Sequence, residues 1–281
     1  MLMKFTKTEN HLLLSDCKNF DPFVSCECGQ CFRFNKISES EYVIFAQNRS
    51  LTIRKQDENW LFLDITEEEF NGKFVRYFDL ERNYGEIIKG YSGDENITRA
   101  VKSGSGIRIF RQDAFETIIS FIISANNNIP RIKKIIEALC KLLGERVGDF
   151  YAFPTPESIV SAGIEGLAPI KAGFRTKYIV DAAQKVASGE ISLEYIKNCG
   201  YVNALTELKK IKGVGDKVAN CALLFGFGYL NAFPIDVWVK RVINKYYGEG
   251  FDPSTLGEYA GVAQQYLFYY ERNILGREEK E

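Results

Sequence analysis

The sequence predicts an α+β protein with an N-terminal antiparallel β domain, residues 1–106, followed by a helical body, residues 107–281. Three observations predict it. Short apolar runs separated by polar turns fill most of the first part. Apolar runs of helical length and period fill the second part. The glycine-rich segment KSGSG, residues 102–106, separates the two patterns and is typical of a hinge or turn.

The N-terminal strands are predicted from four apolar clusters of strand length. Polar stretches lie between them, the longest being NKISES, residues 35–40, so consecutive strands should pair as an antiparallel meander. The stretch that follows, residues 64–91, has a helical pattern. The four predicted strands are CFRF (31–34), EYVIFAQ (41–47), SLTIRKQ (50–56) and NWLFLDI (59–65).

The helices of the second part are predicted from apolar periodicity and from their end signals. Thr155 is a candidate N-cap, and Pro156 suits the first helical position after it. Gly144 and Gly189 suit helix C-termini. The predicted helices cover 113–124, 131–144, 155–163, 174–189 and 256–273.

The middle of the chain carries a positive net charge, and its two ends carry a negative one. The whole chain has a formal net charge of −1. Counted by region, residues 131–245 carry 17 basic and 11 acidic side chains, a net charge of +6. Residues 1–106 carry −3 and residues 246–281 carry −4. A basic face of this kind suffices for phosphate binding even when the total charge is not basic.

The location is predicted from the lack of membrane and export signals. No apolar run reaches the roughly 18 residues of a membrane span, and the first residues do not form a signal peptide. We therefore expect a cytoplasmic monomer that does not bind membranes, nucleoid-associated if the source is prokaryotic.

The seven cysteines are expected to be reduced, because the number is odd and the chain is large. Cys17, Cys26, Cys28 and Cys31 cluster near the N-terminus, but their spacing fits no common zinc pattern. We expect no metal there, and we expect these small side chains to pack within strands.

The stretch LKKIKGVGDKVA, residues 208–219, is predicted to form a helix, a tight hairpin and a second helix. Gly213 and Gly215 permit left-handed backbone and close approach to another surface. The hairpin Lys212–Gly215, which also contains Val214, would present the free N–H groups of a helix start to an anion such as a DNA phosphate. The alternative is a solvated helix turn with a basic face.

Lys217 falls in the first turn of that second helix, among apolar neighbours. The helix dipole and the apolar surroundings both disfavour its charged form, and a neutral amine is a nucleophile. Cys221 is four residues further on and shares the same face. Asp236, in the segment FPIDVWV, is either an N-cap or a carboxylate able to stabilise a developing cation.

Six motifs in order give the chain its resemblance to a known family. It resembles the helix–hairpin–helix DNA glycosylase superfamily and, within it, the 8-oxoguanine DNA glycosylase branch, over most of its length. The motifs are GQCFRF (29–34), RQDAFETIISFIISANNNIPRI (111–132), GFRTKY (173–178), GVGDKVANCALL (213–224), FPIDVWV (233–239) and YAGVAQQYLF (259–268).

The resemblance implies a bifunctional enzyme, a DNA glycosylase with AP-lyase activity that removes 8-oxoguanine from double-stranded DNA. By resemblance, Lys217 attacks C1′ of the damaged nucleotide and forms a Schiff base, and Asp236 stabilises the charge that develops on the sugar. Cys221 and Phe268 resemble the pair that sandwiches the extruded base. Gln264 resembles the reader of its Watson–Crick edge, and Gly29 the glycine whose carbonyl accepts the N7 proton.

The residues that face the undamaged strand are also implied by resemblance. Asn126, Arg131 and Arg175 resemble contacts to the orphaned partner base, and Phe174 resembles the wedge that fills the vacated stack. These contacts imply a preference for cytosine as the partner. Trp238 departs from the family pattern, which often has a histidine there.

The family also implies a fold in which a TATA-binding-protein-like β domain packs on the helical body, with the catalytic cleft between helical subdomains. No cofactor is expected, although hairpin carbonyls could hold a monovalent cation.

Two alternatives remain from the sequence. An alkylbase DNA glycosylase shares the architecture but usually lacks a hairpin lysine, and a noncatalytic helix–hairpin–helix module needs only the glycines and lysines. Iron–sulfur relatives carry four cysteines after the aspartate, whereas no cysteine follows Cys221 here.

Overall fold

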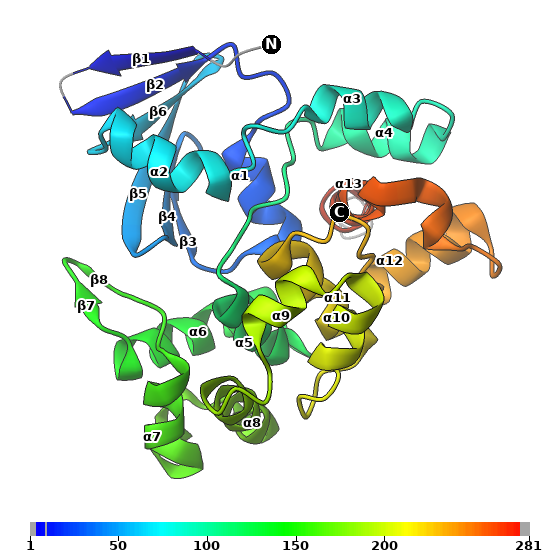
Figure 1. Cartoon of the computed structure of the whole chain (residues 1–281). Helices are drawn as coiled ribbons and strands as arrows, with labels where there is room; N and C mark the ends of the chain where they lie inside the picture. The colour runs from blue at the N-terminus through cyan, green and yellow to red at the C-terminus, as the bar shows by residue number, and fades with distance from the viewer. Residues whose placement is uncertain (1–3, 9, 276–281) are drawn as a thin grey trace.

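A twisted antiparallel sheet lies at one end of the molecule and a group of helices at the other (Figure 1). This computed structural model describes residues 4–8 and 10–275. The sheet has the strand order β1-β2-β6-β5-β4-β3, so β3 to β6 form the predicted meander and β2 joins its far edge. Its strands are β1 (Lys4–Thr8), β2 (His11–Ser15), β3 (Phe34–Ser38), β4 (Glu41–Ala46), β5 (Arg49–Gln56) and β6 (Asn59–Leu63).

The sheet has an alternating burial pattern, which the side-chain period of two in a strand produces. Helix α2 (Glu67–Tyr77) supplies Phe70 and Phe74 to the core on the buried face. The prediction for the first strand was wrong: only Phe34 of residues 31–34 is in β3, and most of the expected turn, residues 35–38, forms the rest. This edge strand is exposed except for Phe34, so apolar content did not reveal it.

The rest of the chain is mainly helical, as predicted, and the α+β class is confirmed. None of the helices in the described ranges has the length and apolar character needed to cross a bilayer. The remaining elements are α1 (Pro22–Ser25), α3 (Tyr84–Gly90), α4 (Glu95–Ser103), α5 (Ala114–Ser124), α6 (Ile129–Leu143), β7 (Arg146–Val147), β8 (Phe150–Tyr151), α7 (Pro156–Gly166), α8 (Thr176–Ala187), α9 (Leu193–Asn198), α10 (Tyr201–Leu208), α11 (Asp216–Ala222), α12 (Val237–Val242) and α13 (Ala260–Tyr269).

Side-chain caps begin the central helices where the sequence provides them. The Thr155 hydroxyl accepts a hydrogen bond from Ser158 N at 3.2 Å, and Pro156 opens α7, as predicted. Asp113 caps α5 and Asn128 caps α6 in the same way. These caps satisfy N–H groups that a helix leaves unpaired at its start.

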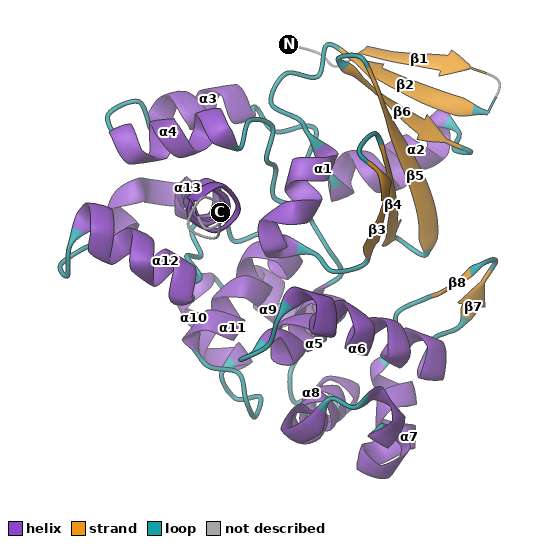
Figure 2. Ribbon diagram, turned by 180° about the vertical axis from the view of Figure 1, so that it is seen from behind, coloured by secondary structure: helices purple, strands orange, loops and turns teal. Residues whose placement is uncertain are grey.

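Helix α5 is the centre of the helical body. Eight of its eleven residues are buried, and it packs against α11, α6 and α8. Helices α3 and α4 precede residue 106 but lie beside α13 and share the core of the body (Figure 1). The predicted domain boundary at residue 106 therefore stays a prediction. On the far side, the β7–β8 hairpin approaches the sheet (Figure 2), with Phe150 of β8 and Phe45 of β4 at 5.6 Å between ring centroids.

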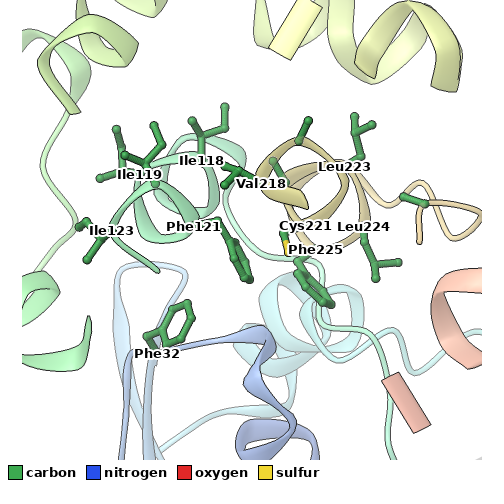
Figure 3. Close-up of a cluster of buried hydrophobic side chains, with 14 of the residues drawn as sticks. Phe32, Ile118, Ile119, Phe121, Ile123, Val218, Cys221, Leu223, Leu224 and Phe225 are labelled. Carbon is green, nitrogen blue, oxygen red and sulfur yellow. The ribbon is translucent and has the colours of Figure 1, made fainter. Parts of the chain in front are cut away.

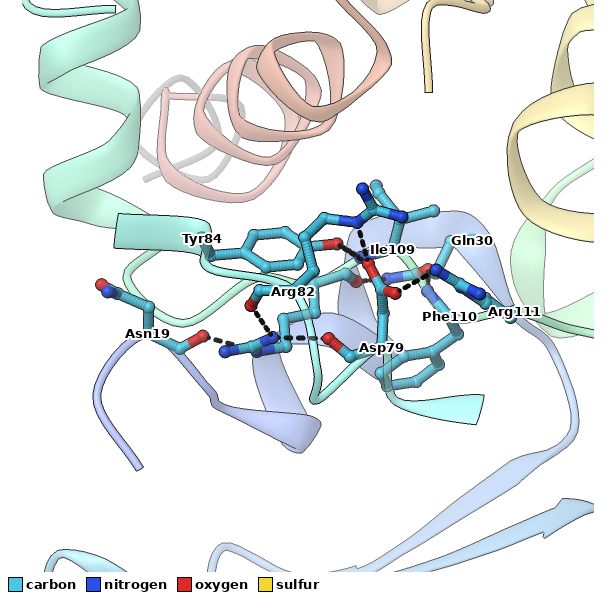
Figure 4. Close-up of polar contacts among 9 residues, drawn as sticks. Asn19, Gln30, Asp79, Arg82, Tyr84, Ile109, Phe110 and Arg111 are labelled. Atoms are coloured by element: carbon cyan, nitrogen blue, oxygen red, sulfur yellow. Dashed lines mark hydrogen bonds and ion pairs between the residues drawn. The ribbon is translucent and has the colours of Figure 1, made fainter. Parts of the chain in front are cut away.

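A polar network joins the sheet to the body (Figure 4). Arg108 donates hydrogen bonds to the carbonyls of Asn19, Asp79 and Arg82. The Asp79 carboxylate accepts from Tyr84 and pairs with both Arg82 and Arg111. Because these groups are largely buried and mutually satisfied, the network holds the segment 107–112 in one position relative to the sheet.

Candidate active site and DNA-contact surface

A small cavity of about 50 Å³ lies where α5, α11 and α13 meet the N-terminal turn Cys26–Gln30. It brings together all six residues predicted for catalysis and for the damaged base, although they span more than 200 positions of sequence. Wider grooves exist elsewhere on the surface. The largest of those described has a volume of about 830 Å³, and no lysine lines it. The cavity is lined by Cys28, Gly29, Phe121, Lys217, Cys221, Phe225, Pro234, Asp236, Gln264, Gln265 and Phe268.

Lys217 is the nucleophile candidate, and its amine is held at the cavity by two residues of α5. Its Nζ donates a hydrogen bond to Ser124 Oγ at 3.1 Å. The same atom lies 5.1 Å from the centroid of the Phe121 ring, within reach of a cation–π interaction. The lysine is in the first turn of α11 and is half-buried, as the sequence predicted. One hydroxyl and one ring thus direct the amine toward the space between the helices.

Asp236 fills the N-cap role that the sequence left open, and stabilisation of a developing cation stays a prediction. Its Oδ1 accepts hydrogen bonds from Trp238 N at 3.0 Å and Val239 N at 2.9 Å, so it is the N-cap of α12. Its Oδ2 makes no hydrogen bond within residues 4–8 and 10–275, and the side chain lines the cavity. Asp236 and Lys217 form no ion pair with each other in that part of the chain. The cap fixes the carboxylate and leaves one oxygen available to a charge in the cavity.

Cys221 lies one helical turn beyond Lys217 and is fully enclosed. Burial, only partly offset by the nearby Lys217 amine, raises the pKa of the Cys221 thiol to about 11. It is therefore a neutral, polarisable surface at physiological pH rather than a thiolate. Figure 3 shows Phe121 of α5, Cys221 of α11 and Phe225 of the following turn Leu223–Phe227 extending toward the N-terminal segment that carries Phe32.

Gly29 and Phe268 face each other across the cavity. Gly29 has φ of 79°, a conformation that favours glycine, and a Cβ built on it would lie 3.0 Å from Phe268 Cε1. Gln30 anchors this turn by donating to the carbonyls of Ser25 and Arg108 and accepting from Phe110 N. A cavity of this size holds only a few water molecules, so a base can enter only if the Phe268 ring moves away from Gly29.

Two adjacent glutamines of α13 form a chain of amides at the cavity wall. Gln264 Nε2 donates to the carbonyl of Pro234 at 3.0 Å, and Gln265 Nε2 donates to Gln264 Oε1 at 2.8 Å. Both side chains are 3% exposed. The sequence prediction included Gln264 but not Gln265.

The hairpin between α10 and α11 uses left-handed backbone at Gly213, as predicted, but not at Gly215, which has φ of −96°. Gly213 has φ of 81°, and an added Cβ would lie 2.4 Å from Tyr178 Cδ2, so only glycine fits against that ring. Lys212 N donates to Asp181 Oδ2 at 2.8 Å, which ties the hairpin to α8. Val214 is buried and Gly215 precedes α11 as its N-cap residue.

The hairpin lysines have acidic neighbours that sequence reasoning did not pair. Lys209 pairs with Asp216 and Lys210 with Glu207, each at 2.6 Å, and Lys212 lies 3.4 Å from Asp181. The three lysines are exposed, although Asp216 is the only one of their acidic partners that is exposed as well. Salt therefore screens these pairs, and a phosphate can compete for the lysines.

The predicted partner-base residues lie around the loop that follows α5. Phe174 is 52% exposed, and its ring packs edge-on against Tyr178. Arg175 Cζ lies 4.4 Å from the centroid of the Phe174 ring. Asn126, with φ of 50°, and Arg131 are exposed on the same side. An exposed aromatic next to positive charge is a suitable wedge for a base stack.

Arg175 differs from the exposed contact that the sequence suggested. It is 3% exposed, and its guanidinium donates to the carbonyls of Ala125, Asn126 and Ala172. Four of its five N–H groups are used in these bonds. Burial, followed by the neighbouring charge of Arg131, lowers the pKa of Arg175. Its main role in this structure is to fix the loop that carries Asn126.

Cys26, Cys28 and Cys31 are buried, Cys17 is partly exposed, and the expectation that these cysteines pack in strands was wrong. Cys26 and Cys28 lie in the helical turn Cys26–Gln30, and Cys31 follows it. Cys17 is separate and donates to the carbonyl of Leu14. Within the described ranges no three His, Cys, Asp or Glu side chains are grouped as metal ligands would be.

Several supporting residues escaped the sequence reasoning. Ser124, Gln265 and Asp181 act through contacts with residues distant in the chain, and a pattern read along one element does not reveal them. Gln30 could have been found, because it follows the predicted site residue Gly29 within the motif GQCFRF, and a glutamine there can hydrogen-bond to backbone groups.

Comparison with known proteins connects this geometry to a family. Residues 12–118 match the family model described as 8-oxoguanine DNA glycosylase, N-terminal domain. Residues 119–256 match the HhH-GPD superfamily base excision DNA repair protein model. An Arabidopsis thaliana protein named N-glycosylase/DNA lyase OGG1 is 34% identical over 274 residues, covering 86% of this chain and 75% of the relative. The chain belongs to the 8-oxoguanine DNA glycosylase family.

Two further relatives agree with this assignment. A Saccharomyces cerevisiae protein named N-glycosylase/DNA lyase is 28% identical over 250 residues, covering 79% of this chain and 66% of the relative's length. The crystal structure of Clostridium acetobutylicum 8-oxoguanine glycosylase/lyase, in complex with double-stranded DNA containing cytosine opposite 8-oxoguanine, has a TM-score of 0.90. It is 36% identical and covers 100% of this chain and 99% of that chain. The 8-oxoguanine glycosylase fold therefore extends over the whole chain.

Proposed function

We propose that this protein removes 8-oxoguanine from duplex DNA and then cleaves the strand by β-elimination. The observation that carries the proposal is the cavity itself. It contains a single amine, Lys217, beside one carboxylate, Asp236, and between the surfaces predicted to hold a base. The named activities of the relatives in this family support the same reaction.

The chemistry follows from the two polar groups. The damaged nucleotide must leave the stack to reach the cavity. The Lys217 amine attacks C1′, and the bond between C1′ and the base breaks with its electrons going to the base. The open Oδ2 of Asp236 stabilises the positive charge that develops on the sugar. The amine gives one proton to the departing base. The C1′–O4′ bond then breaks as O4′ takes up a proton, and C1′ is held to the lysine nitrogen as a protonated Schiff base. Loss of a C2′ proton moves its electron pair toward the imine and expels the 3′ phosphate, which cuts the strand.

Discrimination against guanine depends on one proton. 8-Oxoguanine carries a hydrogen on N7, whereas guanine has a lone pair there, and the carbonyl of Gly29 is the acceptor proposed for that hydrogen. The positive φ of Gly29 and the three bonds to Gln30 hold this turn at the cavity. A buried mismatch between acceptor and lone pair costs about 1–3 kcal/mol, which sets the scale of the selectivity.

The partner base is proposed to be cytosine. Arg131 is exposed beside the loop of Asn126, and Arg175 retains one unused N–H. Guanidinium groups offer only donors, and cytosine offers acceptors at O2 and N3. Phe174 would enter the space that the extruded base leaves.

Lys217 and Asp236 weigh against the two alternative functions. An alkylbase glycosylase has no need of an amine placed by Ser124 and Phe121, and a noncatalytic module has no need of the open carboxylate oxygen. Cation binding by the hairpin carbonyls and a nucleoid location remain predictions.

The deciding experiment is cleavage of duplexes that carry 8-oxoguanine opposite each of the four bases, together with borohydride trapping. We expect release of the base, a covalent adduct that requires a Schiff base, and faster reaction opposite cytosine. Lys217→Gln should keep binding to damaged DNA and lose both base release and trapping. Normal trapping by that variant would exclude Lys217 as the nucleophile.

A further inference from the structure

We propose that Gln265 supplies a second hydrogen-bond acceptor for the Watson–Crick edge of the extruded base and so selects a base that carries a 2-amino group. This inference rests on the proposed function and adds a specificity residue to it. Gln265 adjoins Gln264 in the chain and lines the same cavity.

The orientation of both amides follows from a single carbonyl. The carbonyl of Pro234 can only accept, so Gln264 must present its Nε2 to it, at 3.0 Å. The Gln264 Oε1 therefore faces Gln265, which must present its own Nε2, at 2.8 Å. The Gln265 Oε1 is left pointing away from this chain of bonds. Neither amide can be reversed without placing like groups together.

The Gln265 Oε1 has no hydrogen-bond partner among the described residues, although its side chain is 3% exposed. Buried polar atoms are almost always bonded, because an unbonded one carries the cost of lost hydration. Here the unpaired oxygen belongs to a residue of the cavity wall. A donor on a ligand in the cavity would satisfy it.

The Watson–Crick edge of a guanine-type base has donors that could pair with the acceptor oxygens of Gln264 and Gln265. It presents N1–H and a 2-amino group, next to the acceptor O6. Gln264 Oε1 keeps a second lone pair after accepting from Gln265, and Gln265 Oε1 has both of its lone pairs. Both oxygens belong to residues that line the cavity, so we expect them to meet these two donors once a base has displaced the Phe268 ring. An adenine-type edge has a lone pair at N1 and no 2-amino group, so it would meet the same oxygens with repulsion.

The test compares two lesions that differ only in the 2-amino group, 8-oxoguanine and 8-oxohypoxanthine, each opposite cytosine. Single-turnover base release is measured for the unmodified protein and for Gln265→Ala. We expect the unmodified protein to favour 8-oxoguanine on the order of ten-fold, the effect of one buried hydrogen bond. In Gln265→Ala most of that preference should disappear. Equal rates for both lesions in the unmodified protein, or an unchanged ratio in the variant, would overturn the proposal.

Two controls separate recognition from folding. Tyr266→Phe removes another buried hydrogen bond of α13, from Tyr266 OH to the carbonyl of Ile107, away from the cavity, and should leave the ratio unchanged. Cleavage of a duplex with an abasic site needs no base, so Gln265→Ala should retain it. If it does not, Gln265→Met, which preserves the volume, takes its place in the comparison. Absence of both base release and trapping in the unmodified protein would instead refute the proposed function.

Discussion

At the scale of single residues, Asp236 has a structural role in the fold and a proposed role in the chemistry. Its Oδ1 accepts two backbone N–H groups at the start of α12, and its Oδ2 remains for the cavity. The cap fixes the position of the carboxylate, and its charge is the group proposed to act on the sugar. Because asparagine also caps helices well, the two roles can be separated by one substitution.

Asp236→Asn should therefore lower the single-turnover rate of base release by about 100-fold, the usual effect of removing one group that stabilises a transition-state charge. Its free energy of unfolding, measured by urea denaturation, should change by less than about 1 kcal/mol, because the cap persists. Asp113→Asn, which alters the matched cap of α5, serves as the control and should change neither quantity greatly. Equal losses of rate and of stability in Asp236→Asn would show that capping is its only role.

The two arginines near the loop of Asn126 differ in burial, and their substitutions should differ accordingly. Arg131→Ala should reduce the preference for cytosine over adenine by about ten-fold, the effect of losing a bidentate contact. Arg175→Ala should reduce it less, because Arg175 has only one unused N–H. Only Arg175→Ala should also destabilise the fold, by about 1–3 kcal/mol, because it leaves the carbonyls of Ala125 and Asn126 without their donor. Single-turnover rates opposite each base and urea denaturation measure the two effects. An unaltered cytosine preference in both variants would contradict the assignment.

At the scale of elements, the hairpin between α10 and α11 depends on contact with α8. Gly213 packs against Tyr178, and Asp181 accepts the N–H of Lys212. Tyr178 in turn supports the Phe174 ring. The proposed phosphate contact and the proposed wedge therefore rest on the same helix, and their spacing along the DNA is set by α8.

Gly213→Ala should disrupt this arrangement, because the new Cβ would lie 2.4 Å from the Tyr178 ring in a backbone conformation that alanine rarely adopts. We expect a loss of more than about 1 kcal/mol in the free energy of unfolding, together with weaker binding to duplex DNA. Gly215→Ala is the matched control, because Gly215 has φ of −96° and nothing within 4 Å of an added Cβ. Its stability should change by no more than about 0.5 kcal/mol. A Gly213→Ala protein as stable as this control would show that the ring contact is unimportant.

At the scale of the whole molecule, charge is divided between regions rather than spread evenly. The net charge of −1 hides the +6 of residues 131–245, which include α6, α8 and the hairpin. The three hairpin lysines are exposed, although of their acidic partners only Asp216 is exposed as well. DNA can therefore replace these partners, and binding should release counterions.

The affinity for undamaged duplex DNA should accordingly fall steeply with salt. A plot of the logarithm of the affinity against the logarithm of the salt concentration should have a slope of about −3 or steeper, as expected when several phosphates are contacted. Fluorescence anisotropy with a labelled duplex measures it. Lys212→Ala should make the slope shallower by about one unit. An affinity independent of salt would contradict a basic DNA-binding face.

The sequence by itself determined the long helices, three strands of the sheet and the residue types of the site. Periodicity of 3.6 marked α5, α6 and α8, and the pair Thr155 and Pro156 marked the start of α7, because these signals act within one element. The order of the motifs further identified the family, and with it Lys217 and its companions. Such local signals do not depend on what packs against the element.

The tertiary structure alone decided which side chains meet. Lys217 and Ser124 are 93 positions apart, and Gln264 and Pro234 are 30 apart, so no pattern within one element reveals either contact. The same holds for Arg175, whose guanidinium satisfies carbonyls at the end of another helix instead of facing solvent. A polar side chain takes the partner that removes the cost of burying it, and that partner exists only once distant segments have packed together.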